Sequence, residues 1–333
     1  MLEALFLGHP VWMWGAFFVL IAVLLAFDLG VLNRKQRMLS ISQALKLSLF
    51  YIILGLSFSL WVFANLGEQA GYQYLSGYLI EKTLSLDNIF VFVLIFTHFA
   101  VPGEYQHRVL FWGIIGAIIL RGAFIVLGTQ LIAHFDWMMY VLGAFLVYTG
   151  IKMMLAANAE PDIANNKMIK FFSTHFRVTK EYEGTKFFVR KDGVLWFTPL
   201  FLVLVVIDVA DVIFAVDSIP AIFAITQDTF VVLTSNIFAI LGLRALYFAL
   251  AAMMHRFEYL KYGLSLVLVF IGGKMLVNHS VAYDLIQVEY SLLFTVLVIA
   301  VSVVISLVKT RNSEAPEHAQ GWVPGSPPKN DKE

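Results

Sequence analysis

The chain has 333 residues, of which 60% are hydrophobic and only 14% are charged, and its mean hydropathy is +0.80. This composition excludes a soluble globular domain. The formal net charge is zero, so nothing in the composition indicates nucleic acid as a partner. The chain has no cysteine, which excludes disulfides, thiolate metal ligands and nucleophilic-thiol chemistry within it.

Hydropathy predicts nine membrane-spanning helices, each close to the roughly 20 residues that a bilayer core requires. The predicted spans are 11–32, 42–63, 75–98, 107–128, 137–155, 196–216, 229–251, 260–277 and 288–308. The first span has no basic region before it and no small-residue cleavage site after it, so we expect a retained helix rather than a signal peptide. The expected fold is an all-α polytopic membrane helical bundle.

Lysine and arginine orient these spans. Linkers on one side of the predicted membrane carry 18 of the 23 basic residues, whereas the opposite linkers and the N-terminus before Val11 carry none. By the positive-inside rule we expect the N-terminus outside the cell, and the C-terminus and the polar loop 156–195 in the cytoplasm. The tail 309–333 is rich in polar residues and proline and is predicted to be disordered.

An internal repeat divides the chain further. Residues 135–155 match residues 257–277 at eight of 21 positions without a gap. Charged residues also match along one alignment with offsets of 122 to 124, pairing Asp87 with Asp211, Arg121 with Arg244, and Lys152 with Lys274. Each unit has three spans, and because three is odd the second copy would be inverted in the membrane. The predicted divisions are two N-terminal helices (1–64), two three-helix repeats (74–155 and 196–277) and a final helix (286–308).

Acidic residues in the apolar segments point to function. Five of them fall in two segments, 81–88 and 208–220, which belong to the first helix of each repeat; a sixth, Asp28, lies near the end of the first span. An aspartate at the centre of a spanning helix costs about 2.5–3.5 kcal/mol, so five would cost roughly 12–18 kcal/mol without compensation. Inverted repeats are typical of alternating-access transporters, whose sites lie where the repeats meet.

The donors in these segments are all oxygens, which suit hard cations such as Mg²⁺, Ca²⁺ or Mn²⁺. We therefore predict a mid-membrane site for a divalent cation. Its candidate ligands are Glu81, Asp87, Asn88, Asp208, Asp211 and Asp217.

Several basic residues offer the alternative that these acids serve only structural pairing. Arg121, Arg244 and Lys82 are the expected counter-ions, and Asp28 is expected to pair with a base. Asn236 is expected to form hydrogen bonds between helices. Asp217 joins the site only if its helix bends, and Pro220 makes a break there plausible.

With these residues in view, the chain resembles the TerC family of integral membrane proteins, in particular its bacterial Alx-like branch. The resemblance spans about residues 15–308 and rests on GYLIEKTLSLDNIFVF (77–92), DVIFAVDSIPAIFAI (211–225), LTSNIFAILGLRALYF (233–248) and KYGLSLVLVFIGGKML (261–276). The family is similar to LysE-type exporters and is associated with export of Mn²⁺, and its name comes from tellurium resistance. Carried over by position, its motif acids are Glu81, Asp87, Asp208, Asp211 and Asp217. Asp208 stands where similar sequences have Glu.

The expected function is export of a divalent cation, foremost Mn²⁺, across the bacterial cytoplasmic membrane, coupled to protons. Clustered carboxylates would not attract a tellurium oxyanion. The sequence shows no phosphate-binding glycine loop and no nucleophile–base motif, so we expect neither ATP coupling nor an enzyme, and no tightly bound cofactor. Two rivals remain: an exporter of a cationic or zwitterionic amino acid, and a scaffold that binds a protein partner through the 156–195 loop while its acids are structural.

Overall fold

A computed structural model of the protein describes residues 4–32, 41–155, 177–179, 181–191, 193–251, 257, 259–281 and 286–310. The side chains of residues 29–32, 41, 87 and 217 are outside this description. Residues 311–333 of the predicted tail and residues 156–176 of the predicted 156–195 loop also lie outside the described residues.

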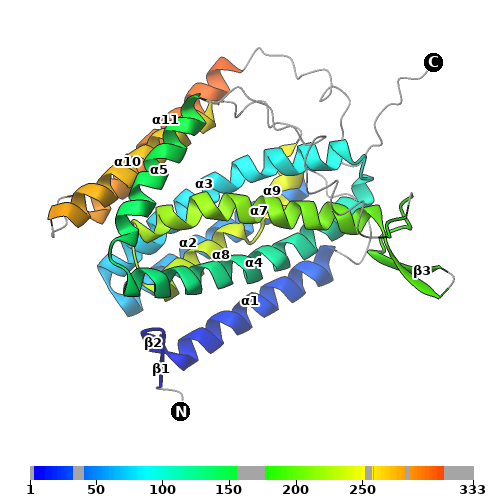
Figure 1. The fold of residues 1–333 in the computed structure, drawn as a ribbon, viewed down its shortest axis with the longest axis horizontal. Coiled ribbons are helices and arrows are strands. Elements are labelled where there is room, and N and C mark those ends of the chain that lie inside the picture. Colours follow the sequence, from blue (N-terminus) through cyan, green and yellow to red (C-terminus); the bar gives the residue numbers. More distant parts are fainter. Residues whose placement is uncertain are drawn as a thin grey trace.

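The described chain is a bundle of helices with two short hairpins (Figure 1). Its helices are α1 (Val11–Leu32), α2 (Ile41–Leu66), α3 (Glu68–His98), α4 (Gly103–His134), α5 (Met138–Leu155), α7 (Pro199–Phe223), α8 (Thr229–Ile240), α9 (Leu243–Leu250), α10 (Leu260–Val281) and α11 (Val288–Lys309). Strands β1 (Leu5–Phe6) and β2 (His9–Pro10) form one antiparallel hairpin, and β3 (Phe188–Lys191) and β4 (Val194–Phe197) form the other.

The predicted all-α membrane bundle is confirmed. Within the described part of the chain, eight helical segments are long and apolar enough to cross a membrane, with α8 and α9 together forming one of them. The remaining predicted span, 75–98, lies within α3, which is 31 residues long but is not among the eight. Glu81, Lys82 and Asp87 lie in the middle of α3 and make it less apolar. Because α3 packs against α2, α7, α8 and α11, its charged face is enclosed by other helices.

The segment α8–α9 is completely buried in the bundle. Asp228 caps its first turn by accepting from the backbone N–H groups of Phe230 (2.9 Å) and Val231 (3.2 Å). The helix then breaks at Leu241 and Gly242, where Gly242 has a left-handed φ of 78° that favours glycine. Non-helical backbone at membrane depth is tolerated where protein surrounds it. The seventh predicted span is therefore a discontinuous helix.

The break expected near Pro220 does not occur. Helix α7 begins at an N-cap formed by Thr198, takes Pro199 into its first turn, and continues through Pro220 to Phe223. Pro220 lies in the last turn of the helix, where its missing N–H removes a single backbone hydrogen bond. The break that Pro220 made plausible is therefore absent from α7, and the helix that does break is α8–α9, at Gly242.

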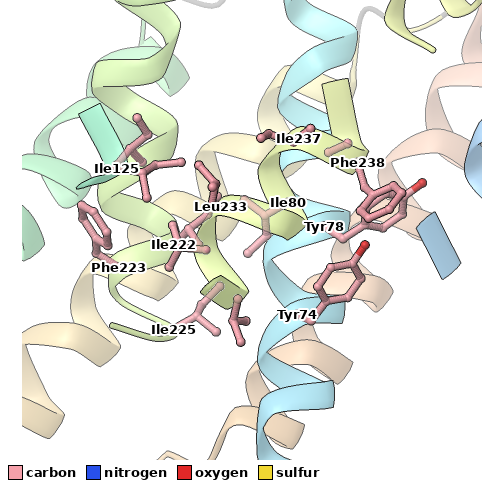
Figure 2. Close-up of a cluster of buried hydrophobic side chains, with 14 of the residues drawn as sticks. Tyr74, Tyr78, Ile80, Ile125, Ile222, Phe223, Ile225, Leu233, Ile237 and Phe238 are labelled. Carbon is pink, nitrogen blue, oxygen red and sulfur yellow. The ribbon is translucent and has the colours of Figure 1, made fainter. Parts of the chain in front are cut away.

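The apolar core runs between α3, α4, α7 and α8 (Figure 2). The rings of Tyr74 and Tyr78 are stacked on one side of it, with centroids 6.2 Å apart. Phe238 of α8 contacts Phe58 of α2 on the same side, at 4.6 Å between ring centroids. This packing fixes the central helix α8 against α2 and against α3, which carries the first of the two acidic segments.

Helices α5 and α10 pack closely and with α11 extend from one end of the bundle (Figure 1). A β-carbon on Gly272 would lie 2.7 Å from the carbonyl oxygen of Gly143, and one on Gly150 would lie 2.9 Å from that of Ser265. The two helices are therefore antiparallel and in backbone contact. In the predicted repeat, Gly143 corresponds to Ser265 and Gly150 to Gly272, so exchanging the repeats exchanges these two contacts. This is the relation expected of an inverted repeat.

Two hairpins connect to the bundle through polar contacts. In the first, His9 Nε2 lies 2.9 Å from both carboxylate oxygens of Asp228, the cap of α8. Beside the second, the hydroxyl of Tyr182 donates to the carbonyl of Phe99 at 2.7 Å, and burial raises the pKa of Tyr182 to about 12. Exposed Glu183 pairs with Lys191 at 2.6 Å, and its hydrogen bond to Lys191 lowers the pKa of Glu183.

The α5–α10 contact generates a stability test. Gly272→Ala should lower the melting temperature of the detergent-purified protein, because the new methyl would meet backbone atoms of α5; overpacking of this kind costs about 1–3 kcal/mol. The neighbouring change Gly273→Ala is the matched control, since no atom lies within 4 Å of a β-carbon there. Equal melting temperatures for the two variants would contradict the close helix contact.

Candidate cation site

A buried arginine occupies the centre of the bundle. Arg121 of α4 binds Asp211 of α7 in two places, from Nε to Oδ2 at 2.9 Å and from a terminal nitrogen to Oδ1 at 2.8 Å. Its other terminal nitrogen donates to Glu81 of α3. Such a fork-shaped contact is the strongest geometry available to an arginine and a carboxylate. Two acids from two distant segments of the chain therefore meet at one guanidinium.

This ion cluster is closed off from its surroundings. Arg121 is 1% exposed, Glu81 0% and Asp211 5%. Its edge is polar: Ser218 Oγ and Asn236 Oδ1 lie 3.3 and 3.4 Å from the same terminal nitrogen of Arg121. One guanidinium and two carboxylates give the three groups a net charge of −1 when all are ionised. Glu81 Oε2 has no hydrogen-bond partner among the described residues. The cluster therefore retains negative charge and an acceptor that is not satisfied.

Asp208 lies one turn of α7 away and faces α4. A β-carbon on Gly116 would lie 2.8–2.9 Å from the carboxylate atoms of Asp208, and one on Gly113 would lie 3.6 Å from Oδ1. Only glycine leaves room for the carboxylate at position 116. Oδ1 of Asp208 is buried without a hydrogen-bond partner among the described residues. Asp208 is therefore a further acid near the cluster, and among the described residues no hydrogen bond or ion pair joins it to Arg121.

A small cavity lies beside Asp211, with a volume of about 20 Å³. A cavity needs at least about 10–15 Å³ to hold one water molecule, so this one has room for a water-sized ligand. Of the described residues that line it, Asp211 is the only acid. The other lining residues are apolar and come from α3, α4, α7, α8 and α9: Phe92, Leu110, Gly113, Ile114, Ala117, Ile207, Ile240 and Leu243.

The structure gives less about the other predicted ligands, Asn88, Asp87 and Asp217. Asn88 is buried on α3, and its amide nitrogen has no partner among the described residues. Asp87 and Asp217 lie in α3 and α7, but their side chains are outside the description. Among the described residues, no group of three His, Asp or Glu side chains is placed to hold a metal ion together. The two acids that do converge, Glu81 and Asp211, have Arg121 between them.

Arg121 lies where a counter-ion was predicted. Arg244 instead binds Asp28 of α1, at 2.6 Å to its Oδ1 and 3.2 Å to its backbone carbonyl. The predicted pairing of Asp28 with a base therefore holds, through a residue 216 positions along the chain.

Lys82 was expected to neutralise an acid and instead contacts the backbone. Its Nζ donates to the carbonyl of Ala239 at 2.9 Å and to that of Leu241 at 3.5 Å. These carbonyls end α8, where the break at Gly242 interrupts the helical hydrogen bonds. A cation is favoured at a helix C-terminus. Sequence reasoning missed this role because the break itself was not predicted there, although Gly242 within the segment Leu241-Gly242-Leu243 was a possible signal.

Comparison with known proteins places this fold in a family. Residues 66–314, which include both acidic segments and both arginines, match the model of the integral membrane protein TerC family. An uncharacterized membrane protein of Rickettsia felis is 44% identical over 296 residues, covering 89% of this chain and 97% of its own. No solved structure matches the chain.

Two further relatives carry the same descriptive name, putative membrane-bound redox modulator Alx. The Salmonella typhi protein is 48% identical over 279 residues, covering 81% of this chain and 86% of its own. The Escherichia coli K12 protein is 47% identical over 279 residues, with 81% and 87% covered. The family match extends over most of the chain and the relatives align over nearly their full lengths. The protein is an integral, multi-pass membrane protein and belongs to the TerC family.

Proposed function

We propose that the protein exports a divalent metal cation, foremost Mn²⁺, through the site formed around Glu81 and Asp211. The observation that carries this proposal is the convergence of two fully enclosed carboxylates, from the first helices of the two predicted repeats, on a single guanidinium. Intramembrane acids that face the interior of a bundle are typical of ion pathways. A transporter whose repeats meet at this point would bind its ion there.

Arg121 acts in this proposal as an internal substitute for the cargo. It satisfies Glu81 and Asp211 when no metal is bound, because buried carboxylates without a cation are costly. An incoming cation takes these carboxylates from Arg121, and the arginine returns when the cation leaves. The site therefore never exposes its acids unpaired. Asp208, with its unsatisfied oxygen beside Gly116, is the nearest further acid to receive the ion.

The chemistry of the donors supports a bare metal ion. Carboxylates, the Ser218 hydroxyl and the Asn236 amide supply oxygen, which hard divalent cations prefer. The cavity beside Asp211 has room for about one water molecule, which favours an ion over an amino acid as cargo. Asn88, Asp87 and Asp217 are proposed as assisting ligands.

The basic linkers support an orientation of the protein, and hence of its cavity, in the membrane. Their distribution favours an extracellular N-terminus and a cytoplasmic C-terminus in a bacterial inner membrane. In that orientation the cavity lies on the cytoplasmic side of Arg121, because Leu110 to Ala117 precede it on a helix that starts in the cytoplasm. Protons enter as the metal leaves, which couples export to a proton gradient. The protein acts as a carrier and not as an enzyme.

The name of the Alx relatives suggests a redox role. The present sequence has no cysteine, so thiol–disulfide exchange on this chain does not support such a role. A metal carrier would act on redox chemistry through the metal that it moves.

Removing the negative charge of Asp211 should abolish transport. Cells that express Asp211→Asn should retain Mn²⁺ at the level of cells lacking the protein, because the amide has no negative charge for the cation. Cellular manganese measured after loading checks this, with equal amounts of folded protein in the membrane. Asp136→Asn, an exposed acid in the α4–α5 turn, is the matched control and should export normally. Wild-type manganese levels in Asp211→Asn would contradict the proposed site.

Removing the guanidinium of Arg121 should make the stability of the protein depend more strongly on Mn²⁺. Arg121→Gln should unfold more easily without metal, by about 3–5 kcal/mol, because two buried carboxylates lose their partner. Its melting temperature should then rise more on addition of Mn²⁺ than that of the wild type, since no arginine has to be displaced. Arg108→Gln on the same helix is the control, because among the described residues Arg108 donates to the Thr185 hydroxyl and lies over the Phe187 ring, away from the acids of the site. A smaller Mn²⁺ shift in Arg121→Gln would show that the arginine does not compete with the cation.

A methyl group placed against the Asp208 carboxylate tests whether this acid binds the transported cation. Gly116→Ala places a methyl against the Asp208 carboxylate and should weaken Mn²⁺ uptake into everted vesicles several-fold. Gly122→Ala, also on α4, is the control, because its β-carbon would meet only Leu233 at an ordinary 3.7 Å. If both variants transport at equal rates, Asp208 is a structural residue.

A further inference from the structure

The two arginines of the predicted repeats bind acids of different origin. Arg121, in the first repeat, binds Asp211 of the second. Its counterpart Arg244, in the second repeat, binds Asp28 of α1, which precedes both repeats. The acid that corresponds to Asp211 in the first repeat is Asp87. Strict exchange of the repeats would therefore pair Arg244 with Asp87.

The helix contacts follow this exchange. Helix α4 packs on α7, and correspondingly α8 and α9 pack on α3, which carries Asp87. The contacts of Gly143 with Gly272 and of Gly150 with Ser265 obey the same relation. The backbone thus brings the segment α8–α9 against α3, mainly through α8, as it brings α4 against α7, whereas α9 with Arg244 packs mainly on α2. The difference between the halves lies in the acid that α1 adds.

Asp28 holds Arg244 by only part of the guanidinium. One terminal nitrogen binds both the Asp28 carboxylate (2.6 Å) and its backbone carbonyl (3.2 Å), and the hydroxyl of Tyr51 is hydrogen-bonded to the same carboxylate. The guanidinium carbon lies 5.7 Å from the centre of the Phe111 ring. Nε of Arg244 is buried and has no partner among the described residues, although the side chain is only 2% exposed. This arginine retains an unused donor.

From these contacts we propose that Asp28 is a positioning residue for the cation site. Asp28 holds Arg244 on α1, whereas strict exchange of the repeats would pair this arginine with Asp87. The inference rests on the proposed function. A second guanidinium at the site would neutralise a further carboxylate and would compete with the cargo as Arg121 does. By binding Arg244, α1 leaves Asp87 to the cation and limits the site to one competing arginine.

Mn²⁺ binding to the purified full-length protein tests this, with the variants Asp28→Asn, Arg244→Gln and the double change. Asp28→Asn should raise the Kd for Mn²⁺ about tenfold, since a released Arg244 turns to the acids of the site. Arg244→Gln should bind Mn²⁺ at least as tightly as the wild type, and the double variant should recover wild-type affinity. A purely structural ion pair predicts instead that both single changes weaken binding alike, and that result would overturn the proposal.

A metal-free measurement separates this inference from the proposed function. Melting temperatures of a double-mutant cycle between Arg244→Gln and Asp87→Asn should show little coupling in the wild-type background and a clear coupling in the Asp28→Asn background. Absence of coupling there overturns the inference, whereas absence of Mn²⁺ binding to the wild type overturns the proposed function alone. If Asp28→Asn does not fold, Arg244→Gln and the double variant decide, because weaker Mn²⁺ binding by either one contradicts the proposal.

Discussion

The packing of the central helices depends on one guanidinium, that of Arg121. Arg121 satisfies two carboxylates in a region where apolar side chains exclude water, and either acid alone would be costly there. To bring them together, α3, α4 and α7 must approach one another around the central helix α8. The stacked tyrosines and the phenylalanines between α2, α3 and α8 supply the apolar contacts that hold this arrangement. The same packing of helices thus forms both the polar cluster and the apolar core.

The other buried charges follow the same rule of local compensation. Lys82 satisfies carbonyls that the break in α8–α9 leaves without helical partners, and the left-handed Gly242 makes that break sterically possible. Arg244 is neutralised by Asp28 from the first helix. These three basic groups therefore have distinct partners: a pair of acids for Arg121, a helix end for Lys82, and a single acid for Arg244. Only the first of these arrangements leaves an excess of negative charge, which is why the proposed cation site lies there.

The relation between the two repeats gives these differences a functional meaning. In the proposed function, a symmetric pair of arginines bound to Asp87 and Asp211 would leave one acid fewer for the cargo. Here α1, which has no counterpart in the repeat, supplies an additional carboxylate for one arginine. The N-terminal helix thereby takes part in the chemistry of the bundle rather than serving only as a membrane anchor. If the protein is the carrier proposed above, its cation competes with one positively charged group and not with two.

Sequence alone determined the fold class, the approximate helices and the family, because a membrane demands long apolar helices and these are visible in composition. It also identified Glu81, Asp211 and Arg121, since charges in such helices are rare and their type reveals their chemistry. Tertiary structure decided which charges meet. Arg244 turned to Asp28, Lys82 turned to backbone carbonyls, and the helix broke at Gly242 while α7 continued through Pro220. The reason is that a buried charge binds whichever partner the packing of distant helices brings within about 3 Å, and no spacing along one helix encodes that distance.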